Sequence, residues 1–160
     1  MRLLGLPLGE WLFFITVPFA CLFTWEVLAA YFPNREWKAH LLIKFSLYFL
    51  FIAATIFAGF HGKEYTFFVS LALIYVLSLD IFLRTHLFRQ SRTYWFSGLL
   101  FIMMLIFNGY LTARPVVQYA AQYQLDIRIY TIPIEDFFYG FSLIFLNLVL
   151  YTKFEGKSHV

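Results

Sequence analysis

Five long apolar segments constrain the fold of this chain more than any other feature of its sequence. A transmembrane α-helix needs roughly 17 to 25 mostly apolar residues to cross a hydrocarbon core about 30 Å thick. Hydrophobic residues make up 62% of the 160 positions and charged residues only 13%, so little length remains for a soluble domain. The sequence therefore predicts an all-α fold, a polytopic bundle of about five transmembrane helices. The expected spans are Trp11 to Phe32, Leu41 to Phe60, Tyr65 to Leu83, Trp95 to Ala113 and Pro133 to Tyr151.

Two other interpretations of these apolar segments fit the sequence less well. The strands of a transmembrane β-barrel alternate apolar and polar residues in pieces of about ten, whereas these segments are continuously apolar. The first segment is too long for the apolar part of a secretory signal, and it lacks a small-residue cleavage site. We therefore expect a retained first helix.

The charges of the chain are better explained by membrane orientation than by binding of nucleic acid. The net charge is +3, but the basic residues flank the apolar segments and form no patch on a soluble scaffold, so no nucleic-acid partner is expected. Cytoplasmic loops of membrane proteins carry an excess of Lys and Arg. The count predicts a protein of the cytoplasmic membrane with its N-terminus outside and its C-terminus inside. The outer side would hold Arg2, Lys63, Arg114 and Arg128, and the inner side Arg35, Lys38, Arg84, Arg89, Arg92, Lys153 and Lys157.

Polar residues within or beside the spans are expected to form two layers. Glu10 and Glu26 lie on one helix about 24 Å apart, at a rise of 1.5 Å per residue, so they cannot serve one reaction centre directly. The outer layer would contain Glu10, Asn108, Glu135 and Asp136, and the inner layer Glu26, Lys44 and Asp80. We expect Glu26 and Asp80 to pair with Lys44 or to make another polar contact. Asn108 can hydrogen-bond between helices.

An internal repeat relates the first predicted helix to the last. At a constant offset of 126 residues, Pro7 aligns with Pro133 and Glu10 with Asp136. Such self-similarity indicates duplicated helical units. We therefore interpret residues 1–160 as a single membrane domain with two parts. Residues 1–32 would be the last helix of an incomplete first module, and residues 41–153 a complete second module.

The acidic residues at these two helix starts can be interpreted in two ways. Hydrocarbon disfavours the charged form of a carboxyl group, so such an acid can hold a proton, as a catalyst for an oily substrate requires. Alternatively, a proline in the first turn with acids beside it is simply what a helix start prefers. Glu135 and Asp136 are adjacent and diverge by about 100°, so one should face the bundle while the other turns toward water or the helix start. The rings of Phe13, Phe14, Phe137, Phe138 and Tyr139 can stabilise a carbocation or only pack.

Several of these motifs together resemble one family of membrane enzymes. The segments are Pro7-Leu8-Gly9-Glu10 running on to Pro18 and Trp25-Glu26, then Asn108-Gly109-Tyr110-Leu111-Thr112, Pro115-Val116-Val117, and Arg128-Ile129-Tyr130-Thr131-Ile132-Pro133-Ile134-Glu135-Asp136. They are similar to the lycopene cyclase domain, the membrane-embedded, non-flavin type found as small paired subunits in some bacteria and fused to phytoene synthase in fungi. The family tends to have two further helices before the first acidic motif, so the resemblance implies that the first helices are lacking here.

The resemblance implies an isomerase, or intramolecular lyase, of carotenoid biosynthesis. It would form end rings on a linear, lycopene-like carotenoid by protonation, ring closure and deprotonation, without a redox cofactor or a metal. The implied catalytic residues are Glu135, Asp136 and Glu10. Implied partners are the lipophilic substrate, membrane lipid and a second cyclase half in a homo- or hetero-oligomer. Implied substrate-binding residues are Glu26, Asn108, Phe13, Phe14, Phe138 and Tyr139.

Two departures from the family pattern keep another function open. Gly9 stands where the family usually has a second acid, and Thr152 stands where the second module often carries a Glu after its Tyr, which is Tyr151 here. Both positions lose a carboxylate. The alternative is a non-catalytic subunit that binds a carotenoid or scaffolds a membrane cyclase complex. A small transporter is a third class.

Overall fold

The computed structural model of the chain contains five long helices, as the sequence predicts. It describes residues 2–3, 6–33, 35–36, 38, 40–114 and 121–158, and the side chains at 2, 3, 6–8, 10, 121 and 156–158 lie outside this description. All five helices are long and apolar enough to cross a membrane. They are α1 (Leu8–Tyr31), α2 (His40–His61), α3 (Glu64–Phe82), α4 (Ser91–Ala113) and α5 (Ile134–Ser158).

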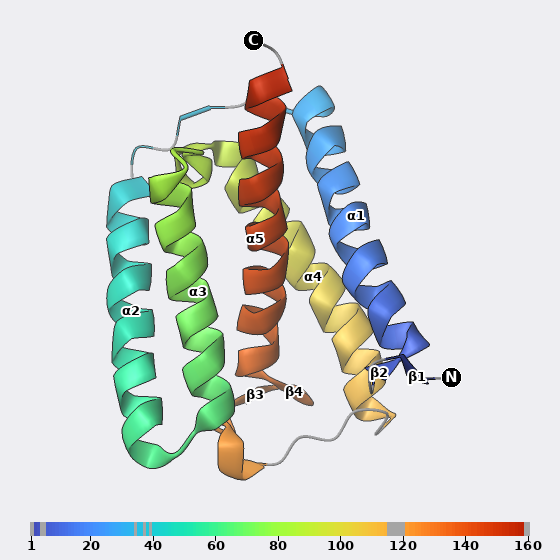
Figure 1. Cartoon of the computed structure of the whole chain (residues 1–160), viewed down its shortest axis with the longest axis vertical. Coiled ribbons are helices and arrows are strands. Elements are labelled where there is room, and N and C mark those ends of the chain that lie inside the picture. Colours follow the sequence, from blue (N-terminus) through green and yellow to red (C-terminus); the bar gives the residue numbers. More distant parts are fainter. Residues whose placement is uncertain are drawn as a thin grey trace.

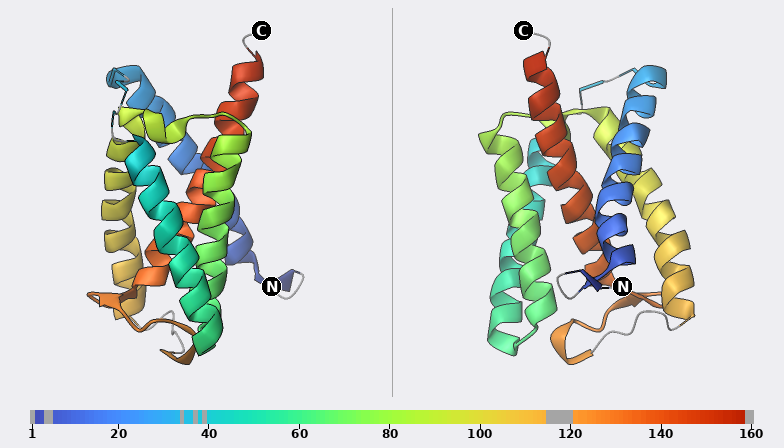
Figure 2. Two further views of the ribbon diagram at one scale, coloured as in Figure 1. Left: turned by 90° about the vertical axis from the view of Figure 1, so that its left-hand side faces the viewer. Right: turned by 45° about the vertical axis from the view of Figure 1, so that its right-hand side comes forward.

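The helices run alternately up and down, so consecutive helices are antiparallel (Figure 1). Helix α5 lies in the middle of the bundle and packs against α3, α1 and α4, while α2 packs on the outer side of α3 (Figures 1 and 2). The starts of α1, α3 and α5 and the end of α4 lie at one end of the bundle, which we call the N-terminal end. The starts of α2 and α4 and the end of α5 lie at the other, the C-terminal end.

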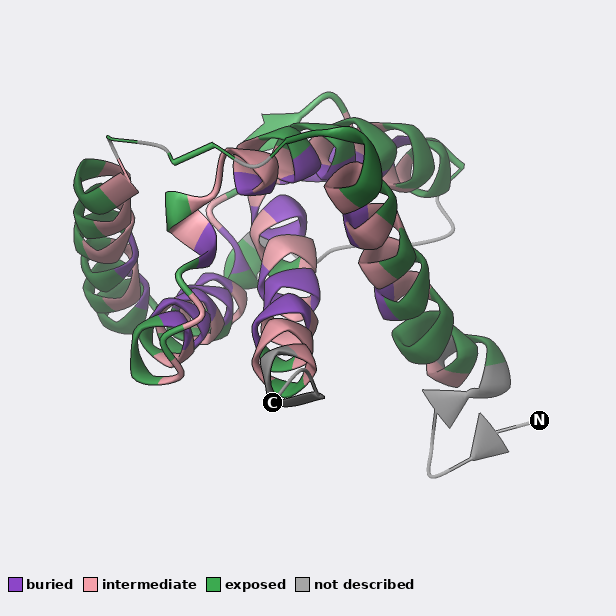
Figure 3. Ribbon diagram, turned by 90° about the horizontal axis from the view of Figure 1, so that it is seen from above, coloured by how far each residue is buried: buried purple, intermediate pink, exposed green. Residues whose placement is uncertain are grey.

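Burial follows this arrangement, because α5 and α3 have neighbours on several sides and the other helices have few. A cluster around α5 contains Trp25, Phe96, Phe137 and Leu148, and a second cluster joins Phe51 of α2 to α3. The outward faces of α1, α2 and α4 carry exposed phenylalanines and leucines (Figure 3). In a chain with five transmembrane spans, such faces suit contact with lipid tails, because the tails are as apolar as these side chains.

The repeat detected in the sequence extends to a small hairpin before each of the two related helices. Strands β1 (Arg2–Leu3) and β2 (Leu6–Pro7) pair just before α1, and β3 (Arg128–Ile129) and β4 (Ile132–Pro133) pair just before α5. Arg2 pairs with Pro7 as Arg128 pairs with Pro133, at the same offset of 126 residues. The two acidic motifs therefore follow the same local structure, a hairpin that ends on proline at a helix start.

Two short 3-10 helices occupy the longer connections. Helix η1 (Leu87–Arg89) lies between α3 and α4 at the C-terminal end, and η2 (Ala121–Tyr123) precedes the second hairpin at the N-terminal end. The sequence predicts that the connection before α5 lies along the membrane interface. In its described part Tyr123 and Tyr130 are exposed. Its position relative to the membrane stays a prediction. Pro115 and Tyr119 lie outside the described residues.

Candidate active site

The two adjacent acids at the start of α5 are both buried. Glu135 is 1% exposed and Asp136 is 6% exposed, which is rare for carboxylates unless they are paired. The expectation that only one of the two would face the bundle is therefore wrong. Its physical basis was a helix with one covered side, whereas the first turn of α5 is covered by α3 and also by the segment that follows η2.

Each of these acids is hydrogen-bonded by a side chain from the first turn of α3. The Thr66 hydroxyl donates to Oε1 of Glu135 at 2.7 Å, and the Tyr65 hydroxyl donates to Oδ1 of Asp136 at 2.7 Å. Gly62, with a left-handed φ of 65°, lies in the tight turn between α2 and α3, just before these two residues. Two adjacent hydroxyl residues on α3 thus face two adjacent acids on α5.

Oxygens Oε1 and Oε2 of Glu135 have different surroundings. Oε1 accepts a second hydrogen bond, from the backbone N–H of Leu125 at 2.7 Å. Oε2 is buried, and no described residue gives it a hydrogen-bond partner. We call Glu135, Asp136, Tyr65, Thr66 and the Leu125 N–H the acid site.

The predicted aromatic residues of α5 lie next to the acid site, on different sides of the helix. The Phe138 ring packs on Phe51 of α2 with a centroid distance of 5.2 Å, and Phe137 packs on Phe101 of α4 at 5.0 Å. Tyr139 is partly exposed on the outside of α5. These rings therefore both fill the core and surround the first turn of α5.

The predicted residues of α1 are placed differently. The backbone of Glu10 lies in the first turn of α1, at the N-terminal end, but its side chain lies outside the described residues. Phe13 and Phe14 contact each other edge to face at 5.8 Å on an exposed part of α1. Convergence of Glu10, Phe13 and Phe14 on the acid site therefore stays a prediction.

Asn108 and Glu26 belong to opposite ends of the bundle, as predicted. Asn108 is half-buried near the end of α4, and its backbone carbonyl accepts a hydrogen bond from Thr112. The Thr112 and Thr131 hydroxyls then link α4 to the hairpin before α5 at 2.5 Å. Glu26 is half-buried at the C-terminal end, where it lies close to Tyr151 of α5.

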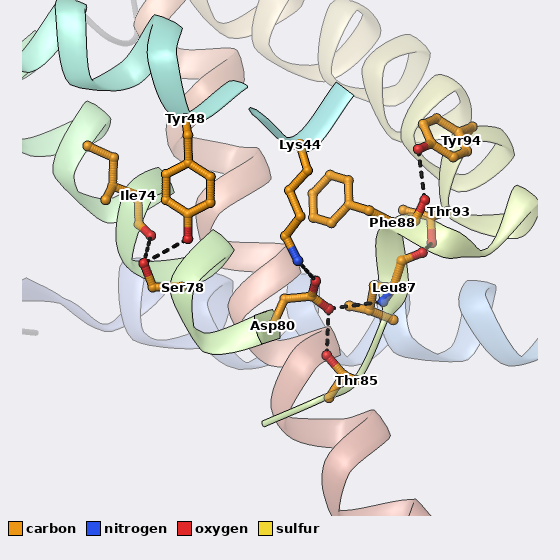
Figure 4. A network of polar contacts seen from close by, with 10 residues as sticks. All are labelled: Lys44, Tyr48, Ile74, Ser78, Asp80, Thr85, Leu87, Phe88, Thr93 and Tyr94. Carbon is orange, nitrogen blue, oxygen red and sulfur yellow. Dashed lines mark hydrogen bonds and ion pairs between the residues drawn. The ribbon is translucent and has the colours of Figure 1, made fainter. Parts of the chain in front are cut away.

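A second polar cluster at the C-terminal end contains the predicted pair of Lys44 and Asp80 (Figure 4). Asp80 of α3 is fully buried and forms an ion pair with Lys44 of α2. Its other oxygen accepts hydrogen bonds from the Thr85 hydroxyl at 2.6 Å and from the Leu87 N–H at 2.9 Å. Every oxygen of Asp80 is thus satisfied, and the cluster ties α2 and η1 to α3, which is the structural role that the sequence predicts.

The fold and the acid site together define a class of protein: a polytopic membrane protein with a pair of buried acids close to one end of its bundle. A family model described as lycopene cyclase matches residues 1–28 and 62–154 of this chain. The chain therefore belongs to the lycopene cyclase family, and this membership supports a carotenoid cyclase-like role. Comparison with curated proteins and with solved structures finds no significant match.

Three contributors to the acid site were not anticipated from the sequence. Tyr65 and Thr66 stand in the first turn of an apolar helix, where polar residues are common, and the Leu125 N–H belongs to a loop. The one available signal was the pair of hydroxyl residues at the same end of the bundle as the acid pair. Their partners are far away along the chain, so only the packing of α3 on α5 identifies them.

Proposed function

We propose that the chain is a membrane lycopene cyclase that closes end rings on a linear carotenoid. The observation that carries this proposal is the acid site of a chain that belongs to this family. Two acids are buried there against an apolar bundle, and one acid oxygen has no described partner.

The proposed reaction moves protons and no net electrons. An acid protonates the terminal double bond of the substrate and leaves a tertiary carbocation. A neighbouring double bond attacks this cation, which forms a carbon–carbon bond and closes a six-membered ring. A base then removes a proton beside the new cation and restores a double bond.

We assign the acid role to Glu135. A protonated Oε2 that lacks a described acceptor can meet the weakly basic π electrons of an alkene, since no stronger acceptor competes for its proton. The two hydrogen bonds to Oε1 then stabilise the negative charge that remains after proton transfer. Asp136, oriented by Tyr65, is the proposed base, with Glu10 as the acid or base contributed by α1.

The aromatic residues are proposed to bind the substrate and the cationic intermediate. Phe138 and Tyr139 follow the acids on α5, and the negative faces of such rings attract cations. Phe13 and Phe14 on α1 are proposed to hold the polyene chain, with Asn108 and Glu26 in supporting roles. We further propose that the acid site lies toward the outer leaflet, because the positive-inside count places the N-terminal end outside.

Expression in a lycopene-accumulating bacterial host tests this function. The chain is expressed alone and together with a longer member of the lycopene cyclase family (the paralogue). Ring-bearing carotenoids are then measured by chromatography. Rings formed by the lone chain support a complete enzyme, and rings formed only with the paralogue support one half of a cyclase. A non-catalytic subunit, which the missing acid at Gly9 favours, would leave ring formation unchanged when Glu135 and Asp136 are replaced in the co-expressed chain.

A further inference from the structure

The segment between η2 and the second hairpin covers the acid site at its outer boundary. The Leu125 N–H donates to Glu135, and the Ile127 carbonyl accepts from the Ile134 N–H at 2.9 Å, so residues 124–127 are fastened to the first turn of α5 at two points. Asp126 turns the chain between them with a left-handed φ of 60°, and its carboxylate pairs with Arg128 at 3.1 Å. We call residues 124–127 the cap.

The cap buries one polar side chain, that of Gln124. Its neighbours Gln122 and Asp126 are exposed, whereas Gln124 is only 1% exposed. Neither Nε2 nor Oε1 of Gln124 has a hydrogen-bond partner among the described residues. Buried polar groups without partners are uncommon in native proteins because they lose their hydrogen bonds to water. A buried amide in this condition indicates a bound polar molecule or a functional role.

Gln124 and Glu135 share this property and belong to the same part of the molecule. The residue after Gln124 donates its backbone N–H to Oε1 of Glu135, and the other oxygen of that carboxyl is also buried without a described partner. An amide offers two donors and an acceptor, and a carboxyl oxygen can donate or accept. Buried water typically binds where two to four such groups lack partners.

The proposed reaction requires a source of protons for Glu135. Glu135 gives its proton to a substrate carbon, and the proton released from the ring goes to the base. Glu135 must then regain a proton before the next ring can form. The proton either returns from the base within the site or comes from solvent. Among the described residues, the cap lies directly against Glu135 at the N-terminal end, and Gln124 is its buried polar side chain.

We propose that Gln124 binds a water molecule beside Oε2 of Glu135 and that this water resupplies the proton Glu135 donates. Gln124 is then a positioning residue that connects the acid to solvent through the cap. This inference rests on the proposed cyclase function. It adds the route by which the acid is recharged, a property that the family assignment does not contain.

Deuterium from solvent tests this route. Membranes that contain the chain, with its paralogue where activity requires it, are incubated with unlabelled lycopene in D₂O buffer, and the deuterium content per ring is measured by mass spectrometry. Wild-type rings should contain solvent deuterium at the carbon that Glu135 protonates. In Gln124→Leu, turnover should fall roughly 10- to 100-fold, which is no more than the loss expected when a positioned proton donor is removed. The rings formed by this variant should also lose deuterium.

Deuterium per ring is independent of the amount of folded protein, so it separates a proton route from a structural role. The matched control is Gln122→Leu, an exposed glutamine in η2, which should leave the deuterium content unchanged. Gln124→Glu keeps a polar side chain that binds water and should restore deuterium. Rings from Gln124→Leu with the wild-type deuterium content would overturn the proposal, whatever their rate of formation.

Measurements on the wild-type chain distinguish failure of the water route from failure of the proposed cyclase function. Rings without solvent deuterium would leave the cyclase function intact and refute the water route through Gln124. A complete absence of rings, with and without the paralogue, would instead refute the proposed function on which the route depends.

Discussion

Replacing Thr66 with valine tests the assignment of Glu135 as the acid. Valine has the shape of threonine but lacks the hydroxyl that donates to Oε1 of Glu135 at 2.7 Å. Both residues are buried, so water cannot easily replace the lost bond. The substitution therefore removes one hydrogen bond with little change in packing.

The expected effect follows from how the strength of this bond changes during the reaction. A hydrogen bond to a neutral group contributes about 0.5–1.5 kcal/mol, and one to a charged group about 1.5–3 kcal/mol. If Glu135 is neutral before the reaction and ionised after it, Thr66 stabilises the later state by about 0.5–2 kcal/mol more. At about 1.4 kcal/mol per tenfold change, ring formation should slow by roughly 2- to 30-fold.

The assay is the initial rate of ring formation in membranes, normalised to the amount of chain. Thr55→Val is a matched control, because the Thr55 hydroxyl bonds only to the Phe51 carbonyl of its own helix. A faster rate in Thr66→Val would mean that Glu135 is ionised at rest and acts as the base. An unchanged rate would mean that the Thr66 bond plays no part in the proton transfer. Either result refutes the assignment.

Three further predictions concern the acid pair and the second polar cluster. Glu135→Gln and Asp136→Asn should each abolish ring formation without reducing expression, and unchanged turnover in both would reject their catalytic roles. Tyr65→Phe should slow ring formation less than Asp136→Asn does, because it only removes a donor to the proposed base; an equal loss in the two variants would show that Tyr65 does more than orient Asp136. Lys44→Met should lower the free energy of unfolding in detergent by about 3–5 kcal/mol, since Asp80 stays buried without its counter-charge. Adding Asp80→Leu should restore part of that stability, and a single variant as stable as the wild type would contradict the role of the pair.

The number, type and approximate positions of the helices followed from the sequence alone, although α4 begins four residues before the predicted Trp95 and α5 extends to Ser158, beyond the predicted Tyr151. A continuous apolar run of sufficient length can satisfy its backbone hydrogen bonds in a membrane only as a helix or a closed barrel, and periodicity excluded the barrel. The two polar layers followed as well, because a helix converts sequence position into depth at a fixed rise per residue. The 126-residue repeat and the acid at each of its two helix starts could likewise be identified without any packing information.

Tertiary structure alone decided what surrounds those acids. That Asp136 is buried together with Glu135 depends on α3 and the cap covering both sides of α5. The partnership of Thr66 with Glu135 and the burial of Gln124 instead of Gln122 depend on how separate segments pack. Hydropathy is almost uniform around α1, α3 and α4, so their sequences carry little information about which face of the helix meets which neighbour. Only the contacts between helices determine that choice.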